Sequence, residues 1–202
     1  MLFLLVAGAA VVTVGILLFL IAYILMKGIP HLRLSLFAWE YNSENVSMLP
    51  AIVNTVLMTA LSLLLAVPVG LFSAIYLTEY AGSRNRLVAV VRITAETLSG
   101  IPSIVYGLFG YLVFFLACGF GYSLLGGALT LAIMILPLIM RTTEEALKAV
   151  PATYREGSYG LGARKLRTIF RIVLPSAMPG ILSGVVLGIG RIVGETAALI
   201  YT

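Results

Sequence analysis

The chain contains no aspartate and no glutamine, and it has only one cysteine and one histidine among 202 residues. The lone Cys118 excludes an internal disulfide and a cysteine metal cluster, and we expect it to be a small buried apolar residue. With one histidine and no aspartate, the sequence also lacks the clustered groups that a membrane-embedded enzyme or a metal site would need. We therefore predict no catalytic residues and no metal ligands.

Charge is equally scarce. Charged residues make up 10% of the chain, whereas 61% of the residues are hydrophobic. A soluble domain carries about 25% charged residues, and several apolar stretches here exceed the roughly 20 residues that cross a bilayer as a helix. The composition predicts an all-α polytopic membrane protein. The net charge of +5 then reports membrane topology, and no nucleic-acid partner is expected.

The sequence contains five candidate spans. The first span and an external segment form an N-terminal part, residues 1–49, and the other four belong to a transmembrane domain, residues 50–202. The third span is interrupted by the sequence Gly100-Ile101-Pro102-Ser103, where glycine and proline should break or kink a helix. The five spans cover residues 2–26, about 50–78, about 87–118, about 128 into the 140s, and about 177 to the end.

The basic residues orient these spans. Ten of the thirteen lysines and arginines fall on one side, which the positive-inside rule makes the cytoplasmic side. The N-terminus is then cytoplasmic, residues 27–49 lie outside, and the loop at about 152–171 lies inside. The ten are Arg84, Arg86, Arg92, Arg141, Lys148, Arg155, Arg164, Lys165, Arg167 and Arg171.

The loop at 152–171 is glycine-centred, basic and amphipathic. We expect a helix over Tyr154–Leu161 that breaks at Gly162, with bulky side chains offered to a groove on a partner. The basic residues after the glycine are also suited to anionic lipid headgroups. No phosphate-binding G-x-x-x-x-G-K-[ST] motif is present, so ATP and its magnesium must bind another chain and no cofactor is expected on this one.

From Glu156 this loop reads EGSYGLGARKLRTIFRIVLP, and it resembles the EAA loop of ABC-importer permeases, which docks on an ATPase subunit. Gly157 and Ser158 stand where that motif has two alanines. The whole chain is similar to the A-type permease subunits of bacterial phosphate ABC importers. The segments that carry this likeness are 54–81, SGIPSIVYGLFGY at 99–111, LPLIMRTTEEALKAVP at 136–151 and GRIVGETAALIYT at 190–202.

The resemblance implies the type I ABC-importer permease fold in a bacterial inner membrane. That family has six spans, so we expect the chain to be C-terminally incomplete. It further implies a second, C-type permease subunit, a dimer of ATP-binding subunits and an external phosphate-binding protein. The residues expected to couple the chain to the ATPase are Glu156, Gly157, Tyr159, Leu161 and Gly162.

Three charged residues are the candidates for the substrate pathway. Arg191 and Glu195 lie four positions apart in an apolar segment, where each charge costs at least about 2.5–3.5 kcal/mol at mid-membrane, and on a helix they would share one face. We expect Arg191 to attract phosphate while Glu195 holds its side chain, or the two to form a structural lock. Arg141 is either a second positive site nearer the cytoplasm or a snorkelling arginine. Three glycines are expected on the face of Arg191: Gly180, Gly184 and Gly188.

Two further expectations concern neighbouring charges: Glu96 should pair with Arg92, four positions before it, and Glu144 with Lys148 on a solvated helix face. Rival functions also stay open. A permease for another oxyanion such as molybdate or sulfate is opposed only by the sequences RTTEEAL and GRIVGETA. An ion-coupled secondary transporter with discontinuous helices is the rival from another class.

Overall fold

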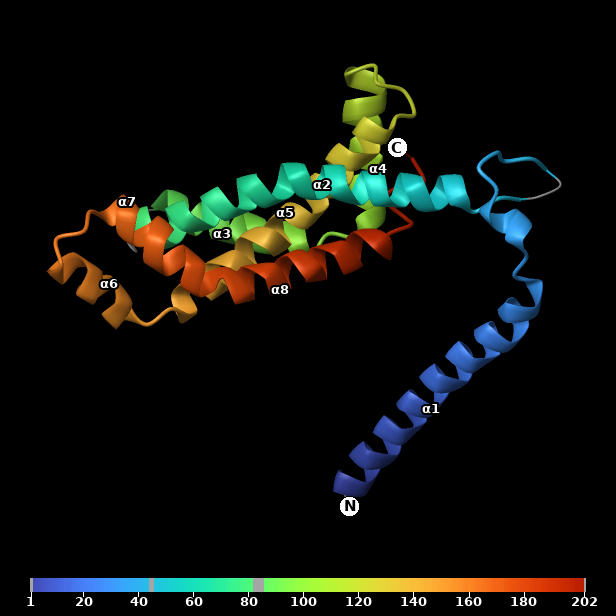
Figure 1. Cartoon of the computed structure of the whole chain (residues 1–202), viewed down its shortest axis with the longest axis horizontal. Coiled ribbons are helices and arrows are strands. Elements are labelled where there is room, and N and C mark those ends of the chain that lie inside the picture. Colours follow the sequence, from blue (N-terminus) through green and yellow to red (C-terminus); the bar gives the residue numbers. More distant parts are fainter. Residues whose placement is uncertain (1, 44–45, 82–85, 202) are drawn as a thin grey trace. The chain divides into compact units, whose positions relative to one another are not determined.

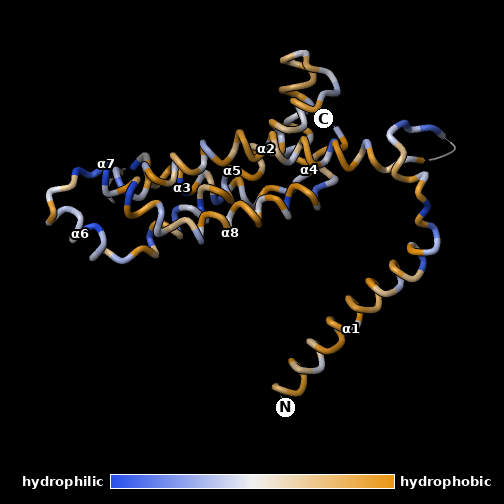
Figure 2. Tube along the Cα trace, in the orientation of Figure 1, coloured by the Kyte–Doolittle hydropathy of each residue, from blue (hydrophilic) through white to orange (hydrophobic). Residues whose placement is uncertain are grey.

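The computed structural model describes residues 2–43, 46–81 and 86–201, and it divides the chain into two compact units, 1–53 and 54–202. The first unit contains α1, Leu2–Gly28, followed by the short 3-10 turns η1, Ile29–His31, and η2, Leu34–Phe37. Helix α1 is hydrophobic over most of its length (Figure 2), as a span surrounded by lipid would be, and Lys27 lies in its last turn.

In the part of the second unit that the structure describes, helices joined by loops are the regular secondary structure and no strand is found (Figure 1). Three of its segments are π-helical turns, which extend α2 and α4 and precede α8. In chain order the elements are α2, Leu49–Ile75 (which begins in the first unit); η3, Tyr76–Tyr80; α3, Arg86–Ser99; α4, Ser103–Gly110; η4, Tyr111–Ala117; α5, Leu124–Ala149; α6, Ala152–Gly160; α7, Lys165–Thr168; η5, Ile169–Val173; and α8, Leu174–Val193.

Within the described ranges, four helical stretches are long and apolar enough to cross a membrane: Phe3–His31, Leu49–Tyr80, Leu124–Ala149 and Lys165–Val193. A fifth span is formed if Val88–Ser99 and Ser103–Ala117 are counted together, although the chain bends by 102° between these two helices. The bend falls at the predicted break, because Pro102 takes an extended ψ of 140° and begins α4 as its N-cap. Four of the five predicted spans are therefore found as long helices among the described residues, and the predicted third span corresponds to this sharply bent pair.

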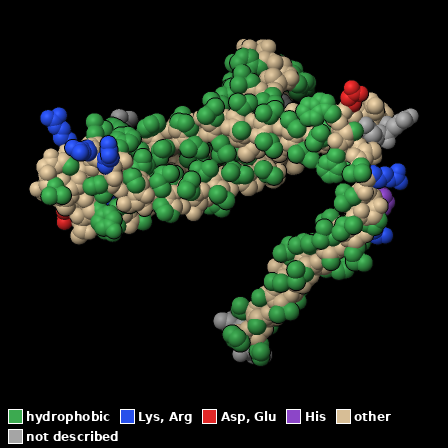
Figure 3. All heavy atoms as spheres, in the orientation of Figure 1, with side chains coloured by type: hydrophobic (Ala, Val, Ile, Leu, Met, Phe, Trp, Pro, Cys, Tyr) green, Lys and Arg blue, Asp and Glu red, His purple; other side chains and the backbone are tan. Residues whose placement is uncertain are grey.

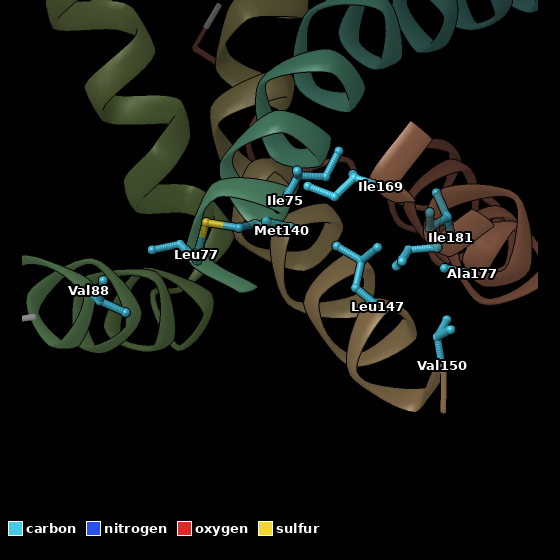
Figure 4. Close-up of a cluster of buried hydrophobic side chains, with 11 residues drawn as sticks. Ile75, Leu77, Val88, Met140, Leu147, Val150, Ile169, Ala177 and Ile181 are labelled. Carbon is cyan, nitrogen blue, oxygen red and sulfur yellow. The ribbon is translucent and has the colours of Figure 1, made fainter. Parts of the chain in front are cut away.

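Helix α5 is the centre of the second unit, and it contacts α3, α4 and α8. A buried cluster joins its C-terminal half to the end of α2 and to the η5–α8 helix (Figure 4). Leu147 and Ile169 are fully buried there, and Ile75 and Met140 pack beside them. Because these residues of α5 are closely packed, a displacement of its C-terminal end must be shared with its neighbours.

The glycine face predicted for α8 is confirmed, and it lies against α5. A Cβ added at Gly180 would come 2.7 Å from the Cβ of Ala146, and one at Gly188 would come 3.3 Å from Cδ1 of Ile139. Between them, Gly184 leaves room for Thr142. The small residues thus let the two backbones approach closely, as in other membrane helix pairs.

Candidate functional site

A cavity of about 560 Å³ opens between α3, α5 and α8. Helix α5 contributes most of its wall, because its turns from Pro137 to Lys148 face both neighbouring helices. Four cationic and three carboxylate side chains line it, so the wall is rich in charge and its net charge is positive. The charged lining residues are Arg92, Glu96, Arg141, Glu144, Glu145, Lys148 and Arg191.

Arg141 and Arg191, predicted from sequence as pathway residues, lie on different helices and both line this cavity. The Nε of Arg141 lies 3.2 Å from Oε1 of Glu145, but both side chains are about two-thirds exposed, so this ion pair holds the arginine only weakly. Arg191 is half-buried and makes no ion pair with any residue that the structure describes. Both guanidinium groups are therefore available to an anion.

The expected pairing of Arg191 with Glu195 is wrong. Helix α8 ends at Val193, and Gly194 closes it by donating its N–H to the carbonyl of Gly190. Glu195 therefore lies beyond the helix, where its Oε1 accepts a hydrogen bond of 3.0 Å from the backbone N–H of Ala198. The carboxylate satisfies a backbone donor in the segment after the helix, and it does not hold Arg191.

The expected Arg92–Glu96 pair is also replaced. The Nη2 atom of Arg92 lies 2.6 Å from Oε1 of Glu144 on α5, and Nζ of Lys148 lies 2.6 Å from the same oxygen. The predicted Glu144–Lys148 pair is thus confirmed, but the expectation of a solvated face is wrong because Glu144 is only 7% exposed. Glu144 joins α3 to α5 through two cations, and Glu96 keeps its carboxylate free of ion pairs among the described residues.

The predicted loop helix is confirmed as α6, Ala152–Gly160, which begins after Pro151 as its N-cap. Gly162 has a φ of +79°, a conformation that glycine adopts without the steric cost of a side chain. In this turn the N–H of Gly162 donates to the carbonyl of Tyr159 at 2.9 Å, and the N–H of Ala163 to that of Ser158 at 3.1 Å. These bonds satisfy two carbonyls at the end of α6.

The outer surface of α6 is exposed, as expected of a docking surface. Tyr159 is 42% and Leu161 91% exposed, and Glu156 and Gly157 also face outward. Ser158 is instead buried, and its Oγ lies 2.8 Å from Oγ1 of Thr168. Of the two small residues that replace the motif's alanines, then, one packs inward and the other stays open.

The segment from α6 through α7 forms a hydrophilic end of the second unit (Figure 2), and Lys and Arg side chains gather there in the space-filling view (Figure 3). Four cations after Gly162 are exposed, and one of them, Lys165, lies with Nζ 4.7 Å from the centre of the Tyr80 ring. The four cations are Arg164, Lys165, Arg167 and Arg171. Their contact with lipid headgroups stays a prediction.

Sequence reasoning missed Arg155, which it counted only as a cytoplasmic charge. Its Nε and Nη2 donate to Oε1 of Glu79 at 3.0 and 2.7 Å. Its Nη1 donates to the carbonyl of Val150 and its Nη2 to that of Leu147, both at 2.9 Å. The two partners are 76 positions apart, and no local pattern signals the contact.

Metal binding has no support in the described residues, where no group of three or more His, Cys, Asp or Glu is placed to hold an ion. Comparison with known proteins identifies the family of the chain. Residues 66–202 match the family model described as "Binding-protein-dependent transport system inner membrane component". This match covers more than half of the chain, and it includes α5, α6, α8 and the cavity between α3, α5 and α8.

Three curated relatives illustrate the likeness. The probable ABC transporter permease protein YqgI of Bacillus subtilis (strain 168) is 33% identical over 96% of this chain and 66% of its own length. The phosphate transport system permease protein PstA 1 of Mycobacterium tuberculosis (strain CDC 1551 / Oshkosh) is 44% identical over 74% of this chain and 49% of its own length. PstA of Pasteurella multocida (strain Pm70) is 41% identical, with 89% of this chain and 64% of that protein covered.

The chain thus spans about half to two-thirds of the length of these relatives. Among solved structures, a chain of the inward-facing MetNI methionine ABC transporter superposes with a TM-score of 0.59 at 21% identity, over 73% of this chain and 68% of that chain. At that identity the likeness speaks for the fold, which is that of an ABC-transporter permease. The chain belongs to the family of binding-protein-dependent transport system inner membrane components.

Proposed function

We propose that this chain is the transmembrane permease subunit of an ATP-driven importer of inorganic phosphate. The cavity between α3, α5 and α8 carries the proposal, because two arginines without a strong carboxylate partner, Arg141 and Arg191, face it from different helices. Arginine binds phosphate oxygens through two parallel N–H donors, so one unpaired and one weakly paired guanidinium group suit a tetrahedral oxyanion. Relatives from Mycobacterium and Pasteurella are named phosphate permeases, which supports the choice of phosphate.

The residues act by binding and positioning, and the chain itself catalyses no reaction. Arg141 lies eight residues before the end of α5, or roughly 12 Å from it along the helix. Arg191 stands near the opposite end of the neighbouring α8. Phosphate would pass from Arg191 toward Arg141 as the helices rock between outward-open and inward-open states. Each arginine lowers the cost of moving an anion through hydrocarbon.

Partners supply the energy and the substrate. The exposed residues of α6, Tyr159 and Leu161 among them, would dock in a groove of an ATP-binding subunit dimer, where ATP and magnesium bind. A C-type permease subunit and lipid would cover the hydrophobic flank visible in Figure 3, and an external phosphate-binding protein would deliver the anion. We place the assembly in a bacterial inner membrane, with the N-terminus of this chain in the cytoplasm.

Labelled-phosphate uptake tests the pathway in cells without other phosphate transporters, with uptake normalised to membrane-assembled protein. Arg191→Gln and Arg141→Gln should each lower uptake by at least about tenfold, which is about 1.4 kcal/mol of barrier and within reach of one lost charged contact. Arg33→Gln removes an exposed positive charge outside the cavity and should leave uptake unchanged. Near-normal uptake by both pathway variants, or uptake of labelled sulfate or molybdate in place of phosphate, would contradict the proposal.

A further inference from the structure

The inner face of α6 carries an attachment that its proposed docking on the ATPase does not use. We infer that Arg155 is a positioning residue that transmits movement of α6 to two spans, to α2 through Glu79 and to α5 through the backbone carbonyls at its end. The inference rests on the proposed docking of α6, and it concerns the step after docking. What carries it is one side chain that bonds to the ends of two spans at once.

The first attachment is to α2. Glu79 lies in η3, the π-helical turn that ends the Leu49–Tyr80 span, and its side chain is only 6% exposed. Arg155, at 19% exposed, donates to one carboxylate oxygen of Glu79 through two nitrogens. A contact with two donors from a planar guanidinium fixes orientation as well as distance. The end of α2 must therefore follow a rotation or a shift of α6.

The second attachment is to α5. The last carbonyls of a helix have no partner within it, and Arg155 satisfies those of Leu147 and Val150 at 2.9 Å each. The guanidinium uses four of its five N–H donors in this arrangement. Its positive charge also lies at the negative end of the α5 helix dipole. One residue of α6 thus holds both spans by directional bonds.

The attachment leads toward the cavity. Leu147 lies six residues after Arg141 on α5, or roughly 9 Å along the helix axis. Leu147 is fully buried, so a displacement at this point is passed to its neighbours. The docking residues Tyr159 and Leu161 are instead exposed, and so the same short helix presents one surface to a partner and another to the spans.

Truncation of either residue would leave the other charge buried without a partner, which confounds folding with function. Conservative variants lessen this problem, because each keeps a hydrogen-bonding group at the contact. Arg155→Lys keeps the charge, but a single ammonium on a flexible stem cannot reproduce the planar fork. Glu79→Gln keeps an oxygen that can accept from Arg155 and loses the charge. Both variants should assemble with the ATPase at the wild-type level.

The experiment uses the complete transporter in proteoliposomes, with its binding protein and inorganic phosphate, and measures phosphate transported per ATP hydrolysed. Arg155→Lys should lower this ratio by at least about fivefold, which corresponds to about 1 kcal/mol. Glu79→Gln should lower it less, and the double variant should match Arg155→Lys, because residues acting through one contact are not additive. Leu131→Ala is the control, because Leu131 is a fully buried side chain elsewhere on α5. It should lower the amount of assembled protein and leave the ratio unchanged.

Unchanged ratios in both conservative variants would overturn the inference, and so would additive losses or a loss of ATPase recovery in Arg155→Lys. Docking is tested separately by Leu161→Ser, which alters the exposed surface of α6 and leaves Arg155 in place. Normal ATPase recovery and normal uptake with Leu161→Ser would contradict docking through this surface, whatever the Arg155 variants do.

Discussion

Gly184 of α8 lies so close to Thr142 of α5 that a side chain at the glycine would collide with the threonine hydroxyl and its Cβ. Thr142 in turn donates that hydroxyl to the carbonyl of Leu138 at 2.9 Å, so it cannot rotate away without losing a hydrogen bond. The contact stands one residue from Arg141. Packing at this point therefore sets how closely α8 approaches the cavity wall.

Gly184→Ala should destabilise the packing of α5 on α8 by about 1–3 kcal/mol, the usual cost of overfilling a close contact. The midpoint of thermal aggregation in detergent measures this loss. Gly190→Ala is the matched control, because nothing lies within 4 Å of a Cβ at that position of the same helix. Equal midpoints for the two variants would show that the helices separate freely at Gly184.

Gly162→Ala should weaken ATPase recovery on copurification from detergent. The φ of +79° is strained for any residue with a Cβ by about 1–2 kcal/mol, and relief of that strain would turn the end of α6. Gly160→Ala tests the same change in open space within the helix, where alanine is the better helix former. If both variants recover the ATPase equally, the turn at Gly162 does not matter for docking.

Local patterns predicted much of this fold. Long apolar runs predicted α1, α2, α5 and α8, because only a helix satisfies the backbone within hydrocarbon. Glycine and proline at 100–102 predicted the break between α3 and α4, and Pro151 with Gly162 bounded the helix that became α6. In each case the signal lies within a few residues of the structure it determines.

The candidate site was less predictable, since its contacts join residues that are distant in sequence. Arg92 pairs with Glu144 on another helix and not with Glu96 on its own, because Glu144 is buried and a buried carboxylate interacts more strongly with a cation. The bond from Arg155 to Glu79 is of the same kind. The error at Glu195 came from assuming that α8 continued past Gly194.

That error changes what Glu195 should do in transport. Glu195→Gln keeps an oxygen that can accept the N–H of Ala198, so uptake of labelled phosphate should stay within about twofold of wild type, a barrier change of about 0.4 kcal/mol. Arg191→Gln, measured beside it, should show the tenfold loss expected of a pathway residue. A comparable loss in both variants would return the Glu195 carboxylate to the pathway.

The last prediction concerns topology. Cys118 is exposed, against the expectation that it would be buried, so labelling experiments need a Cys118→Ala background. In that background Ser43→Cys reports on the segment after α1, and Gly157→Cys on α6, where a Cβ would meet nothing within 4 Å. Ser158, although adjacent, is a poor reporter because it is 5% exposed.

The basic residues should keep α6 in the cytoplasm, since their transfer across the bilayer is costly. A membrane-impermeant maleimide should therefore label Ser43→Cys on intact cells or spheroplasts and label Gly157→Cys only after permeabilisation. The ion pair of Arg155 with Glu79 joins the end of α2 to α6. The loop after α2 and the loop that contains α6 should therefore lie on the same side of the membrane. Labelling of Gly157→Cys without permeabilisation, with Ser43→Cys protected, would reverse the orientation and place the proposed ATPase surface outside the cell.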